Sequence, residues 1–151
     1  MATQQLESTQ VGVAGEYYVA AELSVRGLLA TITLRNSRGI DIIVSNADAS
    51  KSASIQVKTS NQKGPKWILT KKSESYYSDN HFYVLVLLHE AGERPDFYIV
   101  PSEELAKSVS KSHRKWLRGK RPDGSPRKDS KIRNFRDAEG KYKEAWHLLG
   151  L

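Results

Sequence analysis

The sequence contains no cysteine, which excludes disulfide bonds, zinc–thiolate sites and cysteine nucleophiles. Long apolar runs are also missing. The longest, from Phe82 to Leu88, is far too short to span a bilayer. The first ten residues are polar and carry one acid and no base, whereas a signal peptide needs a basic start followed by an apolar run. We therefore expect a cytoplasmic protein with no membrane association.

The length of 151 residues favours one domain covering residues 1–151. Charge is distributed unevenly along it. Residues 1–100 contain 10 Lys and Arg and 10 Asp and Glu, whereas residues 101–151 contain 14 and 7 and so carry the whole net charge of +7. A basic C-terminal extension on a neutral body suits a polyanion such as nucleic acid. From charge alone, a solvated, lysine-rich surface without a nucleic-acid partner is about as well supported as a nucleic-acid-binding surface.

Apolar periodicity and turn-forming residues predict a chain of alternating helices and strands. Helices are expected over residues 10–27, 72–79 and 101 to about 117, the last with Ser102 as its cap. Strands are expected over residues 28–34, 40–44, 54–59, 82–89 and 96–100. Residues 67–70 are expected to form a short extension of the sheet. The strand at 82–89 is the most apolar and is predicted to be buried on both faces.

The C-terminal third differs in composition from the rest. Residues 119–131 combine glycine and proline with several basic residues, which predicts a mobile basic loop. The last ten residues, 142–151, include Trp146, Leu148, Leu149 and Leu151 and are expected to dock back on the body.

Asp41, Gln56 and Lys58 are the polar residues whose spacing fits a metal site. Gln56 and Lys58 lie two apart on one predicted strand, so their side chains share a face. A hairpin that turns near residues 48–50 would place Asp41 opposite Lys58. Glu16, on the first predicted helix, is expected to lie over the same surface. Carboxylate and amide oxygens suit a hard cation such as Mg²⁺, and an ammonium group can stabilise charge on a phosphate.

Each of these four positions has an ordinary structural explanation. Gln56 and Lys58 are also what an exposed face of a half-buried strand contains, and an Asp followed by Gln-x-Lys occurs by chance. The spacing by itself is therefore a weak signal.

Three segments resemble the PD-(D/E)XK nuclease superfamily, in its restriction-endonuclease-like and Holliday-junction-resolvase-like branches. The first helix is similar through Gly12-Val13-Ala14-Gly15-Glu16 with Val19, Leu23 and Gly27. The "PD" strand is similar through Gly39-Ile40-Asp41-Ile42, and the "(D/E)XK" strand through Ser54-Ile55-Gln56-Val57-Lys58-Thr59. The resemblance implies an α/β fold with a restriction-endonuclease-like core: a central mixed β-sheet flanked by helices, in the order helix, strand, strand, strand, helix, strand (αβββαβ).

The resemblance also implies roles for the matching residues. Asp41 would be the principal metal ligand, Gln56 would stand where a second acidic ligand is usual, Lys58 would be the catalytic lysine, and Glu16 would match a helix-borne acid that also reaches the metal. It implies Mg²⁺ as cofactor, with Mn²⁺ substituting, DNA as substrate, and a homodimer or larger homo-oligomer. Ile40 replaces the proline of the motif, and Gln56 replaces an acid, which removes one negative charge from the metal site.

Basic residues supply the expected contacts with DNA phosphates. Those of the C-terminal third are Arg114, Lys115, Arg118, Lys120, Arg121, Arg127 and Lys128, and Arg35 and Arg38 come just before Asp41. Aromatic side chains that could stack on bases, although aromatics are more often core residues, are Trp67, Tyr76, Tyr77, Trp116 and Tyr142.

The sequence therefore predicts a Mg²⁺-dependent DNA endonuclease that hydrolyses phosphodiester bonds in duplex or branched DNA. Two alternatives stay open at this point. One is a catalytically inactive DNA-binding domain on the same fold, and the other is a protein-interaction module with a basic tail.

Overall fold

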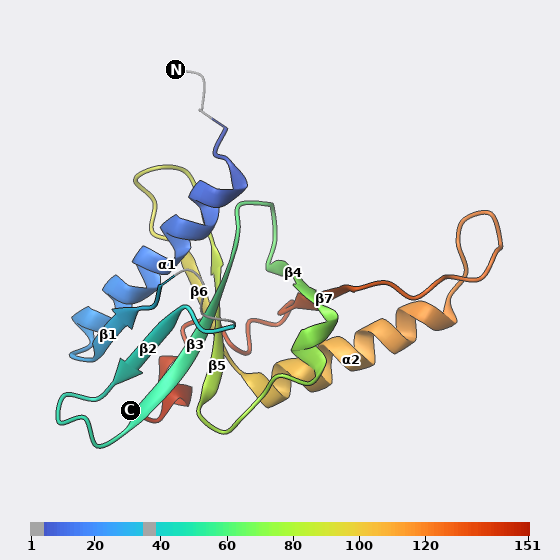
Figure 1. Ribbon diagram of the computed structural model, residues 1–151. Coiled ribbons are helices and arrows are strands. Elements are labelled where there is room, and N and C mark those ends of the chain that lie inside the picture. Colours follow the sequence, from blue (N-terminus) through green and yellow to red (C-terminus); the bar gives the residue numbers. More distant parts are fainter. Residues whose placement is uncertain (1–4, 35–38) are drawn as a thin grey trace.

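The computed structural model describes residues 5–34 and 39–151, which form a mixed β-sheet flanked by helices (Figure 1). The elements in chain order are α1 (Ser8–Val25), β1 (Leu29–Ile32), β2 (Ile42–Ser45), β3 (Ser52–Ser60), β4 (Lys66–Thr70), the 3-10 helix η1 (Lys71–Glu74), β5 (His81–Leu87), β6 (Asp96–Pro101), α2 (Ser102–Arg118), β7 (Ile132–Arg136) and the 3-10 helix η2 (Trp146–Leu149).

Five strands make the main sheet, in the order β1-β2-β3-β5-β6. β3 and β5 are parallel, and the other neighbouring pairs are antiparallel. The sheet is therefore mixed, as the sequence predicts. The β2–β3 hairpin is also confirmed, and it brings Asp41 beside the strand that carries Gln56 and Lys58.

β5 is buried along its whole length and contributes to a core on each face of the sheet. Phe82, Val84 and Val86 pack with residues of α1 and η2. Tyr83, Leu85 and Leu87 pack with residues of α2, β4 and β7. An interior strand covered on both sides buries every residue, and this accounts for its unbroken apolar run.

The connection between the parallel strands β3 and β5 differs from the expectation. It consists of β4 and the four-residue η1, where the sequence predicts a helix over 72–79. β4 pairs with β7 in a separate two-stranded sheet, and β7 is not predicted from the sequence. Its polar composition conceals it, because one of its two buried residues is Arg133, whose charge is paired with Glu74.

Ser102 does not cap α2, which corrects the sequence prediction. The N-cap residue is Pro101. The buried Ser102 hydroxyl instead accepts a hydrogen bond from the Ser78 N–H and donates one to the Ser78 carbonyl. It therefore ties the start of α2 to the loop that precedes β5.

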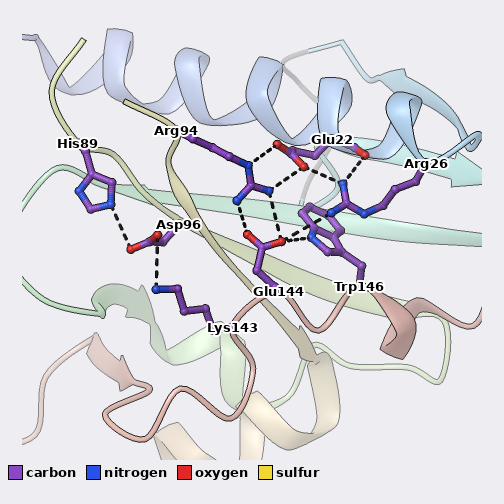
Figure 2. Close-up of polar contacts among 8 residues, drawn as sticks. All are labelled: Glu22, Arg26, His89, Arg94, Asp96, Lys143, Glu144 and Trp146. Carbon is purple, nitrogen blue, oxygen red and sulfur yellow. Dashed lines mark hydrogen bonds and ion pairs between the residues drawn. The ribbon is translucent and has the colours of Figure 1, made fainter. Parts of the chain in front are cut away.

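The C-terminal segment docks on the body as expected, through Trp146 and Leu149 in the core shared with α1. An ion-pair cluster fixes it there (Figure 2). Arg94 binds Glu22 of α1 and Glu144 of the C-terminal segment at the same time. Glu144 also accepts a hydrogen bond from the Trp146 indole N–H at 2.7 Å. Glu22 thus links α1 to this cluster through Arg94.

Candidate active site

Asp41 lies at the entry to β2 and is held to β3 by two hydrogen bonds. Its backbone N–H donates to the Ile55 carbonyl at 2.8 Å, and its side-chain Oδ2 accepts from the Val57 N–H at 2.7 Å. The carboxylate therefore lies against the backbone between Gln56 and Lys58. Burial raises the pKa of Asp41 above its ordinary value of 3.8, although the Val57 N–H and the Lys58 charge act in the opposite direction.

Gln56 and Lys58 are both partly buried and share one face of β3, as their spacing predicts. They line a pocket of about 690 Å³ that lies between β3 and the η1 region. The alternate residues Ile55 and Val57 are buried in the core on the other face. The strand thus presents an amide and an ammonium group to one cavity.

The hairpin register differs from the expectation by two residues. Ile42 pairs with Ile55, so the residue before Ile42, Asp41, comes opposite Gln56, not Lys58. The cause is a turn closed by Asn46. Its backbone N–H donates to the Lys51 carbonyl, its side-chain Oδ1 accepts from the Lys51 N–H, and Ala49 has a φ of 59°. Asp41 still interacts with Lys58 through its charge.

Glu16 reaches the site from the other face of the sheet. α1 packs on the face of Val57 and Thr59, and Gly15 meets Thr59 so closely that a Cβ atom would overlap its side chain. The expectation that Glu16 lies over the Gln56–Lys58 surface is therefore wrong. Glu16 and Asp41 instead line a hollow of about 250 Å³ between α1 and the end of β1.

The four residues consequently line two separate hollows. Glu16 and Asp41 line one, Gln56 and Lys58 line the other, and the Asp41 carboxylate is bonded to the strand that separates them. Lys72 and Tyr76 also line the larger pocket, together with Gly39, whose φ of 69° and contact with the Tyr76 ring leave no room for a side chain. From the sequence, Tyr76 is expected only as an aromatic that could stack on a base, and no motif marks Lys72.

The donor set suits a hard divalent cation that keeps much of its water. Within residues 5–34 and 39–151, no three His, Asp or Glu side chains gather into a metal-binding group. The carboxylates of Asp41 and Glu16, which line one hollow, nevertheless fit Mg²⁺, because this ion is usually held by one or two carboxylates and completes its shell with water and substrate phosphate. The raised pKa of Asp41 indicates a carboxylate whose negative charge is poorly compensated by the chain itself.

The basic residues predicted to contact DNA lie on the distal half of α2 and on the loop beyond it, far from the main sheet in Figure 1. Arg114, Lys115, Arg118, Lys120, Arg121 and Lys128 are exposed. Arg127 is partly buried, because its guanidinium lies over the Trp116 ring and donates to the Trp116 carbonyl. The loop is closed by hydrogen bonds between Arg121 and Ser125 and between Gly124 and Arg121. Arg35 and Arg38 lie outside the described residues.

Two of the aromatic candidates for base stacking contribute to packing: Trp67 is a core residue, and Tyr142 is partly buried against the core. Trp67 is 2% exposed and donates its indole N–H to the Val86 carbonyl. Tyr142 packs against the same core. Tyr76, Tyr77 and Trp116 keep exposed faces.

None of the helices within the described ranges combines the length and the apolar character that crossing a bilayer requires.

No protein-family model matches the chain, and no curated protein matches it. Its fold is similar to that of a solved bacterial homing endonuclease, I-Ssp6803I, with a TM-score of 0.56 at 13% sequence identity. The alignment covers 97% of this chain and 94% of that one, so the likeness extends over nearly the whole of both molecules. The chain accordingly has an α/β fold similar to that of this endonuclease, with a central mixed sheet flanked by helices as expected from the sequence.

Proposed function

We propose that the protein is a Mg²⁺-dependent DNA endonuclease that cuts phosphodiester bonds in duplex or branched DNA. The observation that carries the proposal is the position of Asp41. A half-buried carboxylate with a raised pKa is fixed against β3 between an amide and a lysine, in a fold similar to that of an endonuclease. Perturbed carboxylates beside a cavity are typical of functional sites.

Asp41 and Glu16 would supply carboxylate oxygens to Mg²⁺ or Mn²⁺ from the smaller hollow, and Gln56 would supply an amide oxygen from the larger one. When bound, such an ion polarises a phosphate and lowers the pKa of a water molecule. Lys58, on the same face as Gln56, would stabilise negative charge on the phosphate or orient the attacking water. Lys72 lines the same pocket and adds positive charge where the substrate phosphate would enter.

The basic surface of α2 and its following loop would hold the DNA backbone. Its exposed residues Arg114, Lys115, Arg118, Lys120, Arg121 and Lys128 carry charges that suit phosphate contacts, with Arg127 supporting the loop, and Arg35 and Arg38 are assigned to the same role from the sequence alone. Such contacts position a protein on a duplex without selecting its sequence.

The test is a cleavage assay on supercoiled, linear and four-way-junction DNA, with Mg²⁺ and with EDTA. We expect cleavage with Mg²⁺ only, and a loss of about a hundredfold or more in rate for Lys58→Ala. Lys51→Ala, which removes an exposed lysine from the β2–β3 turn, serves as the matched control and should cut normally. Cleavage that survives Lys58→Ala would contradict the mechanism.

The catalytically inactive alternative has one observation in its favour. Among the described residues, no three His, Asp or Glu side chains form a metal-binding group, and Gln56 lines a different hollow from Glu16 and Asp41. Titration of Mg²⁺ by calorimetry separates the two functions. DNA binding without Mg²⁺ binding or cleavage would support the inactive domain. A protein-interaction module would bind no DNA even at low salt, whereas DNA affinity should fall by about one log unit per log of salt for each phosphate neutralised.

A further inference from the structure

The two-stranded sheet of β4 and β7 has one face in the core and one face toward solvent. Trp67, Leu69 and Phe135 occupy the inner face and pack against the main sheet. The outer face is exposed and consists of three cross-strand pairs: Lys66 with Arg136, Ile68 with Asn134, and Thr70 with Ile132. We refer to these six residues as the ribbon face.

The ribbon face contains two features that are unfavourable in an isolated domain. Lys66 and Arg136 are directly opposite each other, and like charges in that position destabilise a sheet. Within the described part of the chain, no carboxylate forms an ion pair with either of them. Ile68 and Ile132 are 69% and 54% exposed. A polyanionic partner with apolar groups would neutralise the two like charges and cover the two exposed isoleucines.

A groove of about 490 Å³ runs along the ribbon face beside α2. Lys66, Ile132, Asn134 and Arg136 line it from the ribbon, and no acidic residue belongs to its described lining. Ser108, Ser112 and Trp116 contribute from α2. The groove is therefore positively charged and rich in hydrogen-bond donors.

The ribbon face is continuous with the candidate active site. Thr70 belongs to the outer face of β4 and also lines the pocket that contains Gln56 and Lys58. Lys71 and Lys72, which follow it, are exposed, and Lys72 lines the same pocket. A duplex that contacts the ribbon thus borders the pocket that contains Lys58.

We propose that the β4–β7 ribbon enters the major groove of duplex DNA and recognises base pairs directly. The inference rests on the proposed function, and it adds the element that selects the sequence to be cut. The major groove accepts a two-stranded ribbon, and five residues at ~3.4 Å each extend over about four base-pair steps. Asn134 has the amide that pairs with adenine, Arg136 and Lys66 have donors for guanine, and the methyl groups of Ile68, Ile132 and Thr70 suit thymine methyl groups.

A selection experiment tests this assignment. A pool of duplexes with a randomised centre is equilibrated with the full-length protein in EDTA, which prevents Mg²⁺-dependent cleavage, and the bound fraction is sequenced. The wild-type protein should enrich specific base pairs at adjacent positions. Asn134→Ala should lower discrimination at one position about tenfold while the other positions stay selected. Methylation of guanine N7, which lies in the major groove, should block binding at the selected guanines for wild type.

Lys66→Ala and Arg136→Ala should each weaken binding to the selected duplex. A side chain that contacts a phosphate should lower the salt dependence by about one phosphate equivalent when it is removed, and a side chain that contacts guanine should lower the preference for guanine. Lys66→Ala should also raise the melting temperature, since it removes the cross-strand repulsion. A purely structural lysine would show the opposite sign. Lys51→Ala, on the distant β2–β3 turn, is the control and should change neither quantity.

Different results overturn different parts of the argument. If the protein cuts DNA but the combined Lys66, Asn134 and Arg136 alanine variant keeps the wild-type base preference, the ribbon assignment fails and the nuclease function stands. If no duplex binds, both fail. If Ile68→Lys converts an oligomer to a monomer and leaves base preference unchanged, the ribbon face is an interface between copies of the chain, and the assignment is again wrong.

Discussion

Gly15 of α1 and Thr59 of β3 are in contact so close that a Cβ atom on Gly15 would overlap the Thr59 Oγ1 atom. The Thr59 hydroxyl is buried and has no hydrogen-bond partner among the described residues. The missing side chain at position 15 lets the helix backbone rest on the strand. The next residue, Glu16, is thereby placed beside Asp41.

Gly15→Ala should destabilise the protein by about 1–3 kcal/mol, because a methyl group must be inserted into a closed contact. Gly12→Ala is the matched control, since nothing lies within 4 Å of the position where its Cβ would be. It should stabilise α1 by up to about 1 kcal/mol, the helix preference of alanine over glycine. Urea unfolding of both variants measures the difference, and equal effects in the two would contradict this account of the contact.

Asp41→Asn should make the metal-free protein more stable and abolish Mg²⁺ binding. An acid whose pKa is raised by folding contributes most to stability when protonated, and that contribution falls as the pH rises from below 3.8 through the folded-state pKa. At neutral pH the buried charge therefore opposes folding. Asparagine removes the charge and keeps an oxygen for the Val57 N–H.

Thermal melts in EDTA at pH 7 and Mg²⁺ calorimetry measure the two effects. Asp79→Asn, the same change at an exposed position, should alter neither of them. A lower melting temperature for Asp41→Asn than for wild type would mean that the carboxylate is a structural element and not a strained ligand.

The Arg94 cluster should make the protein sensitive to acid. The hydrogen bond from Arg94 is the main reason that the pKa of Glu22 is lowered. Burial raises the pKa of Glu144, but the bonds from Arg94 and Trp146 outweigh it and the net shift is downward. Folded-state pKa values below the ordinary 4.5 mean that this stabilisation is complete above pH 4.5 and is lost as the pH falls through the folded values.

Unfolding free energies measured between pH 7 and pH 3 should therefore decline below about pH 4.5. Arg94→Ala should cost about 1 kcal/mol or less at pH 7, because Arg94 is half exposed and solvent screens its pairs. The variant should also show a shallower acid decline than wild type. If the unfolding free energies of the two proteins decline equally below pH 4.5, other carboxylates cause the loss of stability in acid.

The main sheet and its helices could be predicted because their residues carry strong local signals. The run at β5 is apolar throughout since both faces are covered, and the stripe of α1 has helical spacing. β7 could not be predicted in this way. Its core position is filled partly by Arg133, which becomes buried only because Glu74, 59 residues earlier, neutralises it. Pairing over that distance leaves no periodic pattern in either segment.

The arrangement of the candidate site residues could be predicted only in part. The i, i+2 spacing of Gln56 and Lys58 fixes their common face, and the hairpin brings Asp41 beside them. The register depends on how Asn46 closes the turn, and the face on which Glu16 lies depends on the contact of Gly15 with Thr59. Both are tertiary details that residue types do not encode by themselves.

Gln56→Glu is the sharpest test of the metal ligands. Asp41 comes opposite residue 56, so a second carboxylate there would add charge beside the first. If the amide oxygen of Gln56 is a ligand, the variant should bind Mg²⁺ about tenfold more tightly, and Mg²⁺ should raise its melting temperature more than that of wild type. In EDTA the two carboxylates repel each other, so the same variant should melt lower than wild type.

Gln62→Glu makes the same change at an exposed position just beyond β3 and should leave Mg²⁺ affinity unaltered. For Gln56→Glu, the melting temperature is expected to fall in EDTA, whereas Mg²⁺ binding is expected to tighten. General electrostatic attraction would instead tighten Mg²⁺ binding similarly in both variants and would lower the melting temperature little. Unchanged Mg²⁺ affinity in Gln56→Glu would place residue 56 away from the ion. The metal would then rest on Asp41 and Glu16, in the hollow on the α1 side of the sheet.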